Sequence, residues 1–195
     1  MLKVGIYGGA FDPIHNGHLI TAQAVKEMRE LDKIIFVPTY ISPHKQDVEI
    51  SGVDHRVNMV QIAIKGIPYF EFSDIELKRK MVSYTVDTLK ELSERYKHLE
   101  LIIGYDNIFK FLTWRQPDEI VKIAKLVVLR RKLNIPRGQQ NKFYRAAAFV
   151  KSPFIQISGS IIRRRTHDNL PINFLVPEKV QEYIIKNKLY KGDIP

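Results

Sequence analysis

The chain has 195 residues, of which 45% are apolar and 27% are charged, as expected of a globular domain rather than a disordered chain. It contains no cysteine, which excludes disulfide frameworks, thiolate metal sites and cysteine nucleophiles. The net charge of +10 falls entirely on residues 98–195, with 18 basic and 8 acidic side chains, and this suggests either an anionic partner or a solvated basic surface.

Short apolar runs alternate with segments of helical periodicity along the chain. The predicted strands are residues 3–7, 33–38, 69–75, 99–103, 126–129 and 154–157. The predicted helices are residues 17–31, 53–65, 84–96, 107–114, 118–124, 139–149, 158–166 and 177–188. Ser83 is placed to cap the third helix, and Pro177 suits the first position of the last helix.

This alternation predicts an α/β fold: a Rossmann-like, doubly wound, mostly parallel sheet with helices on both faces. We expect a single domain over residues 1–195, with a C-terminal helical portion at about 158–190. No apolar run approaches the roughly 20 residues that cross a bilayer, and the first apolar residues are too few for a signal peptide. We therefore expect a soluble, cytoplasmic protein with no membrane partner.

Ligands of doubly wound sheets bind beyond the carboxyl ends of the strands, so the residues that follow each strand are the candidates. Residues 8–18 (GGAFDPIHNGH) follow the first strand and open the first helix. Glycines allow close approach of the backbone to a ligand, and a helix N-terminus attracts phosphate. His15 and His18 would donate hydrogen bonds to phosphate oxygens there. The segment is neither a Walker A loop nor a GxGxxG loop.

A metal site is the alternative for this loop, with His15, His18, Asp12 and His44 as ligands. Two histidines three residues apart do not match the spacing of known zinc motifs. We therefore expect no metal ligated by the protein.

Residues 157–163 (ISGSIIR) form the second candidate, since hydroxyls and an arginine at a helix start suit the end of a polyphosphate. Taken alone, Ser158 fits a simple helix cap and residues 163–165 (RRR) fit a solvated face. The pairing with the first candidate segment favours the phosphate site.

Together the two segments resemble the HxGH nucleotidyltransferases, which have GG(T/S)FDPxHxGH and ISSTxIR. Three further segments are similar to those of bacterial nicotinate mononucleotide adenylyltransferases: residues 38–45 (PTYISPHK), residues 74–77 (DIEL) with 82–89 (VSYTVDTL), and residues 103–106 (IGYD) with Trp114. The chain departs from the family pattern in four places: Ala10 replaces Thr or Ser, Gly159 replaces a serine, no glycine precedes Ser83, and residues 130–151 differ.

The resemblance implies transfer of the adenylyl group of ATP to nicotinate mononucleotide, with Mg²⁺ carried by the ATP phosphates. By resemblance the catalytic residues are His15, His18 and Arg163. The implied ATP-binding residues are Gly8, Gly9, Ala10, Phe11, Gly104, Asp106, Ile157, Ser158 and Ser160. The implied acceptor-binding residues are Lys45, Tyr84, Thr85 and Trp114. On local grounds alone, Trp114 also fits a core aromatic residue and Thr85 an ordinary first-turn helix residue.

Three alternatives remain open at this point. A pantetheine-phosphate adenylyltransferase or a cytidylyltransferase shares the HxGH loop but lacks the Ser-Tyr-Thr and Trp114 elements. Class I aminoacyl-tRNA synthetases share it too, but in longer chains with a lysine-rich loop. A nucleic-acid-binding module would explain the basic half, yet no recognisable motif accompanies that charge. The expected partners are therefore ATP and nicotinate mononucleotide and no nucleic acid, with a homodimer left open.

Overall fold

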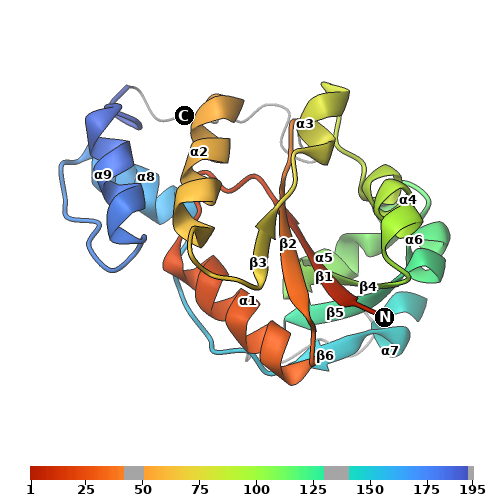
Figure 1. Cartoon of the computed structure of the whole chain (residues 1–195). Helices are drawn as coiled ribbons and strands as arrows, with labels where there is room; N and C mark the ends of the chain where they lie inside the picture. The colour runs from red at the N-terminus through yellow and green to blue at the C-terminus, as the bar shows by residue number, and fades with distance from the viewer. Residues whose placement is uncertain (42–50, 130–140, 193–195) are drawn as a thin grey trace.

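A parallel sheet forms the centre of the computed structural model, which describes residues 1–41, 51–129 and 141–192 (Figure 1). Its strands are β1 (Lys3–Gly9), β2 (Lys33–Pro38), β3 (Phe70–Phe72), β4 (His98–Gly104), β5 (Ala124–Leu129) and β6 (Ala148–Val150). They lie in the order β3-β2-β1-β4-β5-β6, and each strand runs parallel to its neighbours. The strand order reverses between β1 and β4, which is where such sheets open a ligand crevice. The predicted fold class is confirmed.

Helices cover both faces of this sheet. They are α1 (Asn16–Met28), α2 (Val53–Ile64), α3 (Ile75–Arg79), α4 (Thr85–Arg95), α5 (Tyr105–Lys110), the 3₁₀ turn η1 (Phe111–Thr113), α6 (Pro117–Ile123), α7 (Lys142–Ala146), α8 (Gly159–His167) and α9 (Glu178–Lys186). Figure 1 shows α8 and α9 at one end of the molecule, beside α2. Among the described residues, no helix is long and apolar enough to span a membrane.

The continuous apolar run of β2 is explained by burial on both faces. Ile34 and Phe36 pack in one hydrophobic cluster with α1, α2, α8 and α9. Ile35 and Val37, which point the other way, pack in a second cluster with α3, α4, α5 and α6. Since successive strand residues point to opposite faces, a strand covered by helices on both sides is apolar throughout.

Two predicted elements after residue 130 are wrong. Within the predicted helix 139–149, residues 139 and 140 lie outside the described residues; the rest divides into α7 and the edge strand β6. Asn141 caps α7 by accepting a hydrogen bond from the amide of Tyr144 at 3.0 Å. The predicted strand 154–157 pairs with no strand among the described residues. Residues 148–150 fill the edge beside β5 instead, and no local pattern reveals which of two apolar segments takes an edge position.

Three smaller differences concern turns and caps. The predicted strand 69–75 is shorter, because α3 begins at Ile75. Ser83 does not cap α4, which begins after Tyr84; its hydroxyl accepts a hydrogen bond from the amide of Tyr40 at 2.9 Å. Pro177 directly precedes α9 rather than occupying its first helical position.

Candidate active site

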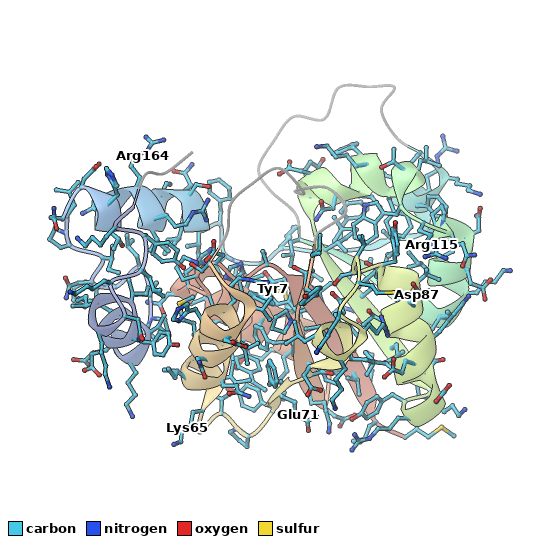
Figure 2. All side chains as sticks on the ribbon, turned by 90° about the horizontal axis from the view of Figure 1, so that it is seen from above. Tyr7, Lys65, Glu71, Asp87, Arg115 and Arg164 are labelled. Atoms are coloured by element: carbon cyan, nitrogen blue, oxygen red, sulfur yellow. The ribbon has the colours of Figure 1, made fainter. Side chains whose placement is uncertain are left out.

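A cleft of about 630 Å³ lies at the carboxyl ends of β1 and β4. Most of the residues expected in the site line it: Gly8, Gly9, Ala10, Phe11, His15, His18, Tyr84, Thr85, Gly104, Trp114, Ile157, Ser158, Ser160 and Arg163. Asp106 is not among the lining residues, and its neighbour Asn107 is. Lys45 lies outside the described residues. Tyr7 also lines the cleft, and in Figure 2 it lies between Arg164 of α8 on the left and Arg115 on the right.

His15 and His18 face each other where α1 begins. The backbone N–H of His15 donates to Nδ1 of His18 at 3.2 Å, so the proton of a neutral His18 ring sits on Nε2. Burial lowers the pKa of His15 to about 4. The pKa of His18 is also lowered, mainly by burial and to a smaller extent by electrostatic repulsion from His15. Both rings are therefore neutral hydrogen-bond donors at physiological pH.

The start of α1 is fixed to the segment before α9. The backbone N–H of Asn16 donates to the carbonyl of Leu175 at 2.9 Å, and its side-chain amide donates to the carbonyl of Phe174 at 2.7 Å. These bonds hold the two histidines against the C-terminal part of the chain.

Arg56 of α2 hydrogen-bonds to the loop at residues 8–18. The sequence did not single it out as a functional residue. Its side chain is only 1% exposed. The guanidinium donates to the carbonyls of Ala10 at 2.9 Å, Thr39 at 2.7 Å, Tyr40 at 3.2 Å and Ser51 at 3.1 Å. Burial lowers its pKa from the usual value. The available signal was a charged residue on the apolar stripe of α2, which such helices rarely tolerate without partners.

Asp12, which the sequence suggested only as a possible metal ligand, also supports the loop at residues 8–18. It is 5% exposed, and one carboxylate oxygen accepts from the hydroxyl of Tyr190 at 2.8 Å while the other accepts from the amide of Ser51 at 3.3 Å. Its backbone carbonyl accepts from the guanidinium of Arg163 at 2.7 Å. Asp12 therefore joins the loop at residues 8–18 to Ser51, to Arg163 of α8 and to Tyr190 near the C-terminus.

At the start of α8, Ser158 fits the helix-cap interpretation, and the neighbouring arginines take different positions. The hydroxyl of Ser158 caps the helix by accepting from the amide of Ile161 at 3.3 Å. Arg163 points into the cleft, whereas Arg164 is exposed on the outer surface (Figure 2). The solvated-face interpretation thus fits Arg164 but not Arg163.

The opposite wall is formed by Tyr84, Thr85 and Trp114. Thr85 is the first residue of α4. The Trp114 ring is half-buried and packs on Phe111 at 5.1 Å between centroids, while also lining the cleft. Arg115 lies 4.6 Å over the Tyr84 ring and 3.6 Å from the Asp87 carboxylate. Figure 2 labels Arg115 and Asp87 on the same side of the molecule. An aromatic ring and a helix N-terminus thus share one wall.

Glu76 of α3 is buried behind this wall and also lines the cleft. Thr88 Oγ1 donates to its Oε1 at 2.7 Å, while Oε2 has no hydrogen-bond partner among the described residues. Burial raises the pKa of Glu76, opposed by hydrogen bonds from Thr88 and Ser83 and by the charge of Arg79. Nothing in the local sequence distinguishes this glutamate from a solvated one.

The donor set gives no cage for a metal ion in the part of the chain that the structure describes. No three histidine, aspartate or glutamate side chains lie together there. His44, one of the four ligands considered, lies outside the described residues.

Comparison with known proteins identifies the family of the chain. A family model described as cytidylyltransferase-like matches residues 6–165. A "Probable nicotinate-nucleotide adenylyltransferase" of Caldicellulosiruptor saccharolyticus is 40% identical, over 97% of this chain and 100% of its own length. A protein of the same name from Thermoanaerobacter sp. is 39% identical, over 98% of this chain and 96% of its own.

Solved structures share the fold. The nicotinic acid mononucleotide adenylyltransferase of Plasmodium falciparum, complexed with NaAD, superposes with a TM-score of 0.80 at 22% identity, covering 99% of both chains. The same enzyme complexed with APC gives a TM-score of 0.78 at 22% identity, again over 99% of both chains. On the family match and the curated relatives, the chain belongs to the nicotinate-nucleotide adenylyltransferases, within the cytidylyltransferase-like nucleotidyltransferases.

Proposed function

We propose that this protein transfers the adenylyl group of ATP to nicotinate mononucleotide, which yields deamido-NAD and pyrophosphate. One observation carries the proposal: a single cleft is lined both by His15, His18 and Arg163 and by the wall of Thr85 and Trp114. The first set suits a polyphosphate and the second a flat anionic ring. The names of the full-length relatives support the same reaction.

The chemistry requires no nucleophile from the protein. An oxygen of the acceptor's phosphate attacks the α-phosphorus of ATP in line, and the bond from that phosphorus to the bridging oxygen of pyrophosphate breaks. The protein contributes by positioning the two substrates and by stabilising charge where it develops.

The two histidines and Arg163 act on different phosphate groups. The neutral imidazoles donate hydrogen bonds to oxygens around the α-phosphorus, with Nε2 of His18 as one donor. Arg163 and the N-terminal amides of α8 stabilise the departing pyrophosphate, since a fixed guanidinium binds phosphate through paired hydrogen bonds.

We expect Mg²⁺ to be held by the phosphates of ATP rather than by the described residues of the protein. No three-ligand cluster exists there, and both carboxylate oxygens of Asp12 already accept hydrogen bonds. When bound, Mg²⁺ would neutralise charge on the phosphates of ATP. Exhaustive chelation followed by Mg²⁺ alone should restore full activity, and stoichiometric zinc lost on His15→Ala would contradict this.

The acceptor wall favours nicotinate over nicotinamide. Thr85 offers a hydroxyl and stands with its amide in the first turn of α4, where N–H groups and the helix dipole favour a carboxylate. A carboxamide would turn its own NH₂ toward one of these donors, and a buried unmatched polar group is penalised. Trp114 would stack on the pyridine ring.

A pyrophosphate-release assay with ATP and a panel of acceptors tests the proposal. We expect nicotinate mononucleotide to exceed nicotinamide mononucleotide in kcat/KM by at least about 100-fold. Equal efficiency on the two would contradict the acceptor site, and turnover of phosphopantetheine instead would identify the sibling enzyme. A cytoplasmic location and a homodimer stay predictions.

A further inference from the structure

Asp12 holds Arg163 in an unusual way. The guanidinium donates to the backbone carbonyl of Asp12 at 2.7 Å, but lies 3.7 Å from the carboxylate of the same residue. The carboxylate has two other donors: its Oδ1 accepts from the hydroxyl of Tyr190 at 2.8 Å, and its Oδ2, the oxygen nearest Arg163, accepts from the amide of Ser51 at 3.3 Å. Arg163 thus hydrogen-bonds to the backbone of Asp12, while its ion pair with the carboxylate stays beyond hydrogen-bond distance.

Tyr190 is delivered to this position by an anchored C-terminal segment. Leu189, the preceding residue, is buried in the core. Lys191, the following residue, donates to the carbonyl of Thr166 near the end of α8 at 2.8 Å. Burial and the negative charge of Asp12 raise the pKa of Tyr190 above its usual value, so the phenol keeps its proton and acts as a donor.

Gly159 permits the close approach on the other side. A Cβ built at Gly159 would lie 2.6 Å from the carbonyl oxygen of Asp12 and 3.2 Å from a guanidinium nitrogen of Arg163. The first distance is too short for any side chain. The glycine at this position, where the resemblance expects serine, therefore allows the Asp12 carbonyl to reach Arg163.

We propose that Tyr190 is a positioning residue for Arg163: its hydroxyl holds the Asp12 carboxylate through Oδ1, which keeps Oδ2 beyond hydrogen-bond distance of the guanidinium and leaves Arg163 available to the β- and γ-phosphates of ATP. This inference rests on the proposed function, in which Arg163 faces the leaving pyrophosphate. A carboxylate within hydrogen-bond distance of the guanidinium would compete with the phosphates of ATP for the same N–H groups.

The decisive variant is Tyr190→Phe, which removes only the hydroxyl. Tyr183→Phe is the matched control, because the Tyr183 hydroxyl also ties α9 to the body, through His55 and Asn58 at 3.0 Å each, without touching Asp12. Calorimetry measures the binding of ATP, pyrophosphate and AMP to each protein. We expect Tyr190→Phe to weaken ATP and pyrophosphate about fivefold to tenfold and AMP less than twofold, the size expected for loss of one hydrogen bond.

Several outcomes would overturn the inference. They are equal losses for ATP and AMP, unchanged binding of pyrophosphate, or the same losses in Tyr183→Phe, each of which would leave Tyr190 as a structural anchor only. Because binding is measured without turnover, the result stands apart from the proposed function. That function fails instead if the wild-type protein releases no pyrophosphate with any acceptor.

Two further variants sharpen the test. In an Arg163→Ala background, Tyr190→Phe should have no additional effect on pyrophosphate binding, because the residue through which it acts is gone. An additive loss would contradict the proposal. Gly159→Ala should reproduce the selective loss of ATP over AMP, since its Cβ displaces the Asp12 carbonyl from Arg163; unchanged ATP binding would contradict the described contact.

Discussion

The imidazole rings of His15 and His18 stack with their centroids 3.6 Å apart and their planes 21° apart. Protonation of either ring would place a positive charge against the other ring in a largely buried site. The pair is therefore held neutral in the free protein, and its two rings act as hydrogen-bond donors before any phosphate arrives.

His18→Ala should abolish adenylyl transfer while leaving the fold intact. The ring supplies a donor where charge develops in the transition state, and loss of such a donor lowers kcat by about 10²–10³. Pyrophosphate release and circular dichroism measure the two effects. His98→Ala, at an exposed position in β4, should turn over normally. Near-normal turnover of folded His18→Ala would remove the histidine from the mechanism.

Acid should destabilise the protein below pH 6.5. The native pKa of His15 is about 4, below the ordinary value of 6.5, so the unfolded chain binds more protons between these values. The contribution of His15 is complete above pH 6.5 and is lost as the pH falls toward 4, by up to about 3 kcal/mol. Urea unfolding at a series of pH values should show a smaller acid loss in His15→Asn than in His98→Asn. Identical profiles would count against burial as the cause.

Trp114→Ala should weaken the acceptor far more than ATP. Loss of ring stacking and of buried apolar surface is expected to raise the KM for nicotinate mononucleotide about tenfold or more. The KM for ATP should change less than threefold. Leu112→Ala, in the same turn but exposed, serves as the control and should alter neither value. A defect confined to ATP would mean that the acceptor wall is misassigned.

Arg56→Lys should destabilise the protein by about 2–4 kcal/mol. Lysine keeps the charge but presents it from one point, so it cannot reach carbonyls on four residues. Urea denaturation measures the loss, and Arg164→Lys on the surface should stay within about 0.5 kcal/mol of wild type. Equal stability of the two variants would show that the Arg56 hydrogen bonds contribute nothing net.

Glu76→Gln should be more stable than wild type at neutral pH. Burial raises the native pKa of Glu76, so its contribution to stability is present below the unfolded pKa and is lost as the pH rises through the native pKa. Glutamine keeps an acceptor for Thr88 without the buried charge. Melting temperatures at pH 4.5 and pH 8 should show the gain at pH 8 only, and none for the exposed Glu94→Gln. A gain that does not depend on pH would contradict this cause.

The sequence by itself identified the two cleft-lining segments whose residues are close together in the chain. The loop at residues 8–18 and the helix start at 157–163 each carry their glycines and their polar or basic residues within a short stretch of the chain, so residue type and spacing alone predict a phosphate site. The buried strands β1, β2, β4 and β5 were also predicted, because helices on both faces of a parallel sheet require continuous apolar runs.

Only the tertiary structure revealed the edge strand and the buried charged residues, because their partners lie far away in the sequence. Residues 148–150, rather than 154–157, form the edge strand because they pack beside β5. Asp12 meets Tyr190 across 178 residues, and Arg56 finds its carbonyls only when three loops converge. A charged side chain has the same local sequence signature whether it is solvated or buried. Its role is set by the groups that replace water around it, and those are brought together only by the folded chain.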